Sequence, residues 1–196
     1  MDINKAVKKE KSHTKIFLTA MSIIAFLLPC ILYLSGIKIK LFYIMYLVII
    51  EFLILISILA KLNFYLVKYK CKNNRLKFKV GLFSNEYVLL CNSVKAVHTM
   101  NSDYDIEIIL ITDIKLRNKG LRVINDKTLK RHKYILKMLK NIEDYDKNKV
   151  YYIEIIKRGG LKKYFLLDCI YKNCVKAFYT DECIQSIKIA RGQMVV

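Results

Sequence analysis

The sequence predicts an α+β membrane protein, in which an N-terminal hairpin of two transmembrane helices precedes a small β domain. Two apolar runs carry the first part of this prediction, one at 16–37 and the other at 41–60. About 20 apolar residues are enough for a helix to cross the hydrocarbon core of a bilayer, and each run reaches that length. Alternation of apolar and charged residues directly after the second run predicts the β domain.

Composition divides the chain into three segments. Residues 1–15 form a basic N-terminus that is expected in the cytoplasm, residues 16–61 the helical hairpin, and residues 62–196 the β domain. A polar segment of about 135 residues is long enough for one compact domain with its own core.

Basic residues set the expected orientation of the hairpin. Five Lys residues precede the first run, only two lie between the runs, and several follow the second run closely. Because Lys and Arg near membrane ends stay in the cytoplasm, we expect a cell membrane protein with two spans and both termini inside. A cleaved signal peptide is disfavoured because a second span follows at once.

The chain carries a formal net charge of +19, and from Lys61 onward it holds 28 Lys and Arg against 13 Asp and Glu. Such a charge suits anionic lipid headgroups, nucleic acid or an acidic protein. Lys outnumbers Arg 29 to 6, as AT-rich codon usage would also produce. The bulk charge is therefore compatible both with an anionic partner and with codon usage, and only the arrangement of the charges can distinguish between them.

The most specific pattern is a two-stranded ribbon over 67–80. Apolar residues alternate with Lys or Arg on either side of Asn73-Asn74, and Asn accepts the positive φ values of a two-residue hairpin turn. The predicted register pairs Val67 with Val80, Tyr69 with Phe78 and Cys71 with Leu76 on one face. The other face carries six positive charges, from Lys68, Lys70, Lys72, Arg75, Lys77 and Lys79.

Further elements follow from periodicity and turn residues. Strands are expected at 86–91, 94–99 and 106–112, and the segment 114–124 is ambiguous, with a turn at Lys119-Gly120. A helix at 128–142, a hairpin of strands at 150–157 and 161–169 joined by Arg158-Gly159-Gly160, and a last helix near 173–191 capped by Asn173 complete the domain.

The helix at 128–142 has a basic exposed side and an apolar stripe. We favour packing of this stripe on the sheet over contact with a membrane. The basic side consists of Lys130, Arg131, Lys133, Lys137 and Lys140.

Glu51 is the only charge in the second apolar run. A proton path would need partners in the first run, which offers only hydroxyl groups. A Glu51 that is either neutralised or directed to a transmembrane interface is favoured; at an interface it would serve self-association into a homo-oligomer or hold another membrane protein.

No motif points to catalysis. The chain lacks a nucleotide-binding Gly loop, a Ser nucleophile elbow and a metal-ligand helix, so no catalytic residue, cofactor or metal is expected. The six cysteines form no C-x-x-C pair and are expected as reduced thiols, those at 71, 91, 169 and 183 on apolar, buried positions. Asp103, Asp105 and Glu107 lack the Gly and closing Glu of a calcium loop and are expected in solvent.

The segment from Cys71 to Ser84 resembles the opening of a bacterial pleckstrin-homology-like (PH-like) membrane family of unknown function. In that family an Arg begins a strand, a Gly-Leu-aromatic bend ends it, and an apolar strand and a V/I-x-x-V segment follow. Arg75, Gly81-Leu82-Phe83, 88–90 and 94–97 occupy these places here. The resemblance covers about residues 15–112 and implies a membrane-tethered, half-open β-barrel used for binding, with a C-terminal helix; the helix at 128–142 is then an insertion.

The sequence therefore predicts a non-catalytic binding module at a membrane surface. Its basic ribbon face would engage anionic lipid headgroups or an acidic membrane partner. The alternative is a regulatory or immunity-type subunit that holds another integral membrane protein through its helices. A nucleic-acid binder is disfavoured, because no recognition helix or stacking-aromatic motif is present.

Overall fold

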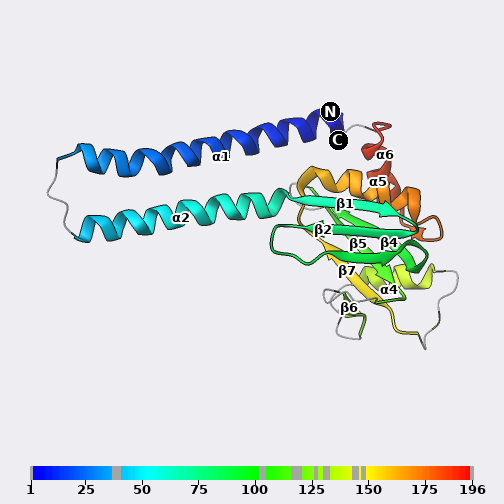
Figure 1. Cartoon of the computed structure of the whole chain (residues 1–196). Helices are drawn as coiled ribbons and strands as arrows, with labels where there is room; N and C mark the ends of the chain where they lie inside the picture. The colour runs from blue at the N-terminus through cyan, green and yellow to red at the C-terminus, as the bar shows by residue number, and fades with distance from the viewer. Residues whose placement is uncertain are drawn as a thin grey trace.

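The computed structural model describes residues 2–36, 41–101, 105–115, 121–125, 128–129, 133–142, 146 and 149–194 of the chain. Two long helices, α1 (Ile3–Leu34) and α2 (Leu41–Tyr65), run antiparallel and project from one side of an α+β domain (Figure 1). Each is long and apolar enough to cross a membrane, and its most apolar stretch is not buried by the rest of the protein. The predicted α+β class with two apolar N-terminal helices is confirmed.

Helix α1 begins well before its apolar run. Asp2 caps it, since Asp2 Oδ1 accepts a hydrogen bond from the Asn4 backbone N–H at 3.0 Å. The basic N-terminal segment is therefore a helical extension of the apolar run. Ile3 is fully buried in the core of the domain, so this extension is docked and is not a free tail.

The two helices pack through a stripe of half-buried side chains that repeats every seven residues. This is the spacing of a left-handed helix pair, in which the same face of each helix stays against its partner. The stripe includes Val7, Thr14, Met21 and Leu28 in α1 and Leu47, Ile54 and Lys61 in α2.

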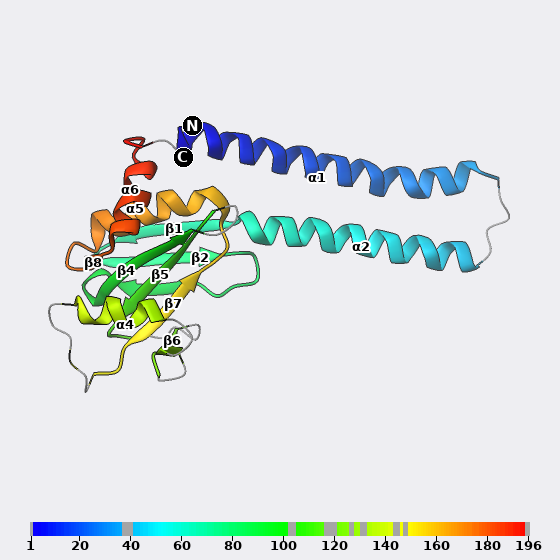
Figure 2. The ribbon, with the colours of Figure 1, turned by 180° about the vertical axis from the view of Figure 1, so that it is seen from behind.

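Two sheets form the domain (Figures 1 and 2). The first is antiparallel with strand order β1-β2-β3, and its strands are β1 (Val67–Lys72), β2 (Arg75–Val80) and β3 (Tyr87–Leu90). The second has the order β6-β7-β5-β4-β8, with β8 parallel to β4. Its strands are β4 (Val94–Asn101), β5 (Ile106–Thr112), β6 (Arg122–Val123), β7 (Tyr152–Ile156) and β8 (Phe178–Tyr179).

The strand predicted at 161–169 is wrong. A short 3₁₀ turn, η2 (Gly160–Lys162), leads there into helix α5 (Lys163–Asn173). Side chains on several sides of α5 are buried in the core, and such a continuous apolar run does not distinguish a strand from a buried helix. The Gly159-Gly160 pair, which suggested a hairpin turn, begins η2 instead.

The predicted last helix is also divided differently. Asn173 ends α5, and its side-chain Nδ2 donates to the Cys169 carbonyl at 2.7 Å. The final helix, α6 (Asp181–Ala190), is capped by Thr180 Oγ1, which accepts from the Cys183 N–H at 3.4 Å. The segment between the two helices includes β8, because Phe178 and Tyr179 extend the second sheet beside β4.

The core lies on both faces of the second sheet. One face packs with the first sheet, α5 and α6, and the opposite face packs with α4 (Lys133–Lys140). Ile135, Met138 and Leu139 of α4 are buried there, as the preferred interpretation of its apolar stripe predicts. The two sheets stay separate, so no closed barrel is formed by the described residues. The predicted turn at Lys119-Gly120 lies outside them.

Candidate functional site

The ribbon has the predicted register along its whole length. Strands β1 and β2 pair Lys68 with Lys79, Lys70 with Lys77, and Lys72 with Arg75. Asn73 and Asn74 close the hairpin with φ values of 52° and 59°, the left-handed pair that a type I′ turn requires. Alternation then places all six basic side chains on one side of the ribbon, which we call the basic face.

The opposite side of the ribbon fixes which face is turned outward. Leu76 is fully buried and Phe78 is 1% exposed, and burial of such side chains stabilises by about 1.5–3 kcal/mol each. The Tyr87 ring of β3 stacks on Phe78 with ring centroids 5.0 Å apart. Burial raises the pKa of Glu154 of β7, which interacts with the Tyr87 hydroxyl, to about 7. The ribbon is therefore held against the second sheet and cannot turn its charges inward.

The charges of the basic face are uncompensated. Five of its six side chains are exposed and Lys79 is half-buried. Within the described part of the chain, none of the six forms an ion pair. Other basic residues do find carboxylates, namely Lys95, Lys157, Lys163, Lys172 and Arg191. Like charges opposed across a ribbon are destabilising, by about 0.2–1 kcal/mol per pair, so the fold itself gains nothing from this arrangement.

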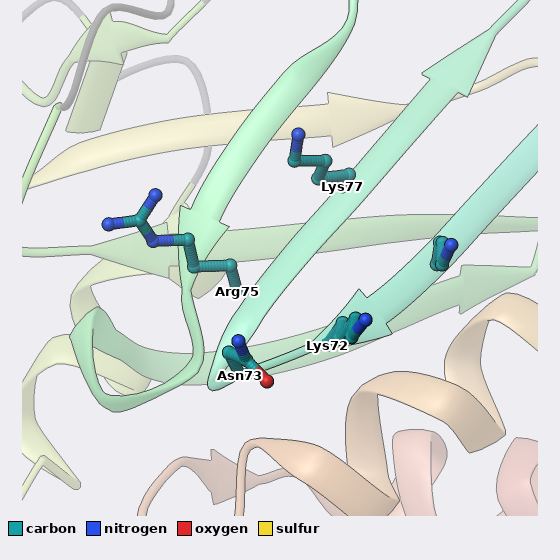
Figure 3. A pocket seen from close by; sticks show the side chains of 5 residues that line it. Lys72, Asn73, Arg75 and Lys77 are labelled. Carbon is teal, nitrogen blue, oxygen red and sulfur yellow. The ribbon is translucent and has the colours of Figure 1, made fainter.

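Two shallow hollows follow the basic face. One of about 520 Å³ is lined by Lys70, Lys72, Asn73, Arg75 and Lys77 (Figure 3). A second, of about 420 Å³, continues along the ribbon past Lys68 and Lys79 to the loop at 84–86, where the exposed Glu86 is the one acidic residue in its lining. Lys70 and Lys77 line both, so the two hollows form one trough whose cationic groups only donate hydrogen bonds. Such a surface suits carboxylate or phosphate oxygens.

The ribbon points away from the helices. Strand β1 begins two residues after α2 ends and continues onward from it, so the ribbon turn lies far from the helical pair (Figures 1 and 2). Lys68 and Lys79 lie at the near end of the ribbon, and Lys72 and Arg75 lie at the far end, four residues or about 13 Å further along at about 3.3 Å per residue. A flat surface, such as that of a membrane, placed where the helical pair meets the domain would therefore contact only the near end of the basic face.

A second charged site joins α1 to the domain and was not predicted from the sequence. We call this site, formed by Glu10, Asp105 and Lys163, the junction. Glu10 of α1 accepts a hydrogen bond from the Leu161 backbone N–H, at 3.2 Å to Oε2. Nearby, Lys163 is fully buried and donates to Asp105 Oδ1 and to the Lys157 carbonyl, both at 2.8 Å. Burial raises the pKa of Glu10 and lowers the pKa of Lys163, while the pairing with Asp105 opposes the shift of Lys163.

Two glycines allow the close approach at the junction. Gly159 has φ 128° and its N–H donates to the Phe64 carbonyl of α2 at 2.9 Å, while Gly160 has φ 53°. A Cβ on Gly159 would collide with Val67, and one on Gly160 would collide with the Glu10 carboxylate. The only sequence signal for this docking was the helical spacing of apolar residues in the basic N-terminus, at positions 3, 6 and 7.

Of the acidic residues at 103–107, Asp105 has a largely buried side chain and Glu107 lies in β5. The Asp105 side chain is 9% exposed and pairs with Lys163, and Glu107 lies 3.6 Å from Lys157 Nζ. The prediction that these carboxylates are solvated is therefore wrong for Asp105, and Asp103 lies outside the described residues. The buried Lys163 ammonium accounts for the position of Asp105, and the exposed Lys157 pairs with Glu107.

Glu51 lies on the stripe of α2 that packs against α1. Its Oε1 atom is buried and has no hydrogen-bond partner among the described residues. The expected role of Glu51 at a transmembrane interface stays a prediction. On the basic side of α4, Lys137 and Lys140 are exposed, and the side chains of Lys130, Arg131 and Lys133 lie outside the description.

All six cysteines are free. Cys91 and Cys183 are buried as expected, while Cys71 and Cys169 are half-buried. Cys71 Sγ lies 3.6 Å from Cys91 Sγ, and burial raises the pKa of Cys71 to about 11, which keeps it a neutral thiol.

Comparison with protein-family models, with curated proteins and with solved structures finds no match for this chain. The basic face and the junction are therefore interpreted from their own geometry and chemistry.

Proposed function

We propose that the protein is a membrane-anchored, non-catalytic binding module whose basic face holds an acidic segment of a membrane partner. Helices α1 and α2 would cross the cell membrane as a hairpin, with both termini and the domain in the cytoplasm. The observation that carries this proposal is the array of six cations on one rigid face without ion-pair partners in the described chain.

The direction of the ribbon favours an acidic partner over lipid headgroups as the main ligand. Headgroups of the leaflet beside α2 would reach Lys68 and Lys79, whereas Lys72 and Arg75 would stand beyond them. Attraction to an anionic leaflet falls off within a Debye length, about 8–10 Å in physiological salt. A peptide that rises from the membrane beside the domain could follow the whole trough.

The relationship to the PH-like membrane family is part of the proposal. It is supported by the two helices that lead directly into a β domain and by α5, which packs between the sheets after the last long strand. The helical segment around α4 would then be an insertion on the outer face of the second sheet.

The test measures binding of a fluorescent poly-glutamate peptide to the full chain in nanodiscs of zwitterionic lipid. The variant Lys70→Glu/Arg75→Glu/Lys77→Glu reverses the centre of the trough. Its matched control, Lys140→Glu/Lys176→Glu/Lys188→Glu, makes the same charge change at exposed positions elsewhere. We expect the first variant to lose about tenfold or more in affinity and the control to lose much less. Equal losses would show that bulk charge, not the basic face, binds the peptide.

Anionic lipid in the nanodisc separates the two ligand classes. Because headgroups reach only the near end of the ribbon, we expect anionic discs to weaken peptide binding only modestly. Complete loss of peptide binding in those discs would mean that lipid covers the face, and the headgroup interpretation would replace the partner interpretation.

The regulatory or immunity-type alternative rests on the helices instead. Large apolar side chains cover the outer surfaces of α1 and α2, and another membrane protein could occupy part of them. Photo-crosslinking in cells to one stoichiometric partner, unchanged by the three Glu substitutions on the basic face, would favour this alternative.

A further inference from the structure

The loop between β2 and β3 presents an exposed aromatic side chain next to the helical pair. Phe83 is 75% exposed, more than any other aromatic residue described after α2. The loop lies on the side of the domain from which α1 and α2 project, beside the end of α2 (Figures 1 and 2).

Hydrogen bonds tie this loop to the end of α2. The Gly81 N–H donates to the Leu66 carbonyl at 2.7 Å, and the Leu82 N–H donates to Asn63 Oδ1 at 2.8 Å. Gly81 has φ +90°, and a Cβ there would lie 2.5 Å from Asn63 Oδ1, so only glycine fits this contact. The position of Phe83 along α2 is thereby fixed by the fold.

That position coincides with the end of the apolar run. Asn63 follows Lys61 by two residues, and Lys61 is the first charge after the run. If α2 crosses a bilayer, the loop is level with the boundary between headgroups and acyl chains. Phe is among the apolar side chains that membrane-surface elements bury at that boundary, and basic residues nearby in the chain, such as Lys61 and Lys79, suit an anionic leaflet.

We infer that the loop at 81–86 is a third membrane contact, in which Phe83 inserts into the interfacial layer of the cytoplasmic leaflet. This inference rests on the proposed membrane hairpin and adds a lipid-binding element in the globular domain. With α1, α2 and Phe83 all in contact with lipid, the domain cannot rotate about the helices. The ribbon then keeps a fixed direction, with the near end of the basic face at the membrane surface and the far end pointing away from it.

The chain contains no Trp, so single-Trp variants report local environment without background. We choose Phe83→Trp as the test, Phe26→Trp in the apolar part of α1 as the membrane reference, and Val175→Trp in the turn after α5 as the solvent reference. Phe26 and Val175 are 72% and 80% exposed, so neither substitution disturbs packing. Each full-length variant is reconstituted in liposomes with lipids brominated near the headgroup or near the chain centre, and its emission is recorded.

The expected result is a blue-shifted Phe83→Trp emission that lipids brominated near the headgroup quench most strongly. Phe26→Trp should be quenched by bromine along the chains, and Val175→Trp should keep its red-shifted, unquenched emission. An unquenched Phe83→Trp beside a quenched Phe26→Trp would overturn the inference and leave the membrane hairpin intact. An unquenched Phe26→Trp would overturn the hairpin itself. A blue-shifted but unquenched Phe83→Trp would mean that a second copy of the chain covers the loop, which also overturns the lipid inference.

Discussion

Lysine residues have opposite environments in two regions of this molecule. At the junction, Lys163 is fully buried, and Asp105 and a backbone carbonyl each accept one of its hydrogen bonds at 2.8 Å. On the basic face, three like-charged pairs stand opposed across a ribbon. Buried charge persists in a fold only when it is compensated, and exposed charge can persist uncompensated when something outside the chain supplies the counter-charge. The junction is therefore structural, and the basic face, whose cations form no ion pair in the described chain, is the surface to which we assign the proposed binding role.

The largest expected effect is at the junction. Lys163→Met removes the cation and leaves Asp105 buried without its partner, so the free energy of unfolding should fall by about 3–5 kcal/mol. Urea denaturation of the full chain in detergent micelles, followed by circular dichroism, measures the change. The neighbouring Lys162→Met is the control, because Lys162 is only half-buried and forms no ion pair among the described residues. Equal effects at both positions would contradict the structural role of Lys163.

A smaller effect is expected where α1 meets the junction. Gly160→Ala introduces a Cβ that collides with the Glu10 carboxylate at a residue with positive φ. Gly192→Ala is the control for the stability loss that comes from the backbone conformation alone. Gly192 also has positive φ, but nothing lies within 4 Å of its Cβ position. The left-handed conformation alone disfavours Ala by about 1–2 kcal/mol. We expect Gly160→Ala to exceed the control and to increase proteolysis of residues 3–15; equal stability losses would show that Glu10 is not held at this site.

The smallest effect is expected on the basic face, and its sign is reversed. Lys77→Glu turns the repulsive Lys70–Lys77 pair into an attractive one. The free energy of unfolding should therefore rise slightly, by about 0.2–1 kcal/mol. The gain should shrink with added salt. Lys95→Glu is the matched control and should destabilise, because it breaks the 3.4 Å pair with Asp113. A loss of stability in Lys77→Glu would mean that the fold depends on this cation and would weaken the distinction between the two regions.

The basic ribbon shows how much short-range pattern can predict. Its register, its turn at Asn73-Asn74 and the direction of its charges all follow from alternation within 14 residues. Strand β5 was predicted from a run of β-branched residues, and β7 was predicted at 150–157 as one arm of a hairpin whose other arm proved to be a helix. Glu10, Lys163 and Asp105 could not be found in this way, because they are up to 153 residues apart in the sequence and have ordinary local surroundings.

Helix α5 shows where local pattern is ambiguous. Leu166, Leu167 and Ile170 are buried in α5 between the two sheets, so the segment lacks the polar side that would identify a surface helix. Gly159-Gly160 is suited to a hairpin turn but is required here for the approach of α1 and α2. The strand at 161–169 was predicted wrongly because contacts with distant parts of the chain determine the conformation of both the apolar run and the glycines.

By itself the sequence determined the two apolar helices, the strands of the ribbon and the side on which its charges lie. These features depend on side-chain periodicity and on the conformational preferences of neighbouring residues, which act over a few positions. Only the tertiary structure decided that the N-terminal helix docks through Glu10, that Lys163 is buried, and that the ribbon runs away from the helical pair. Those features depend on which surfaces exclude water together, and that is settled by packing across the whole chain.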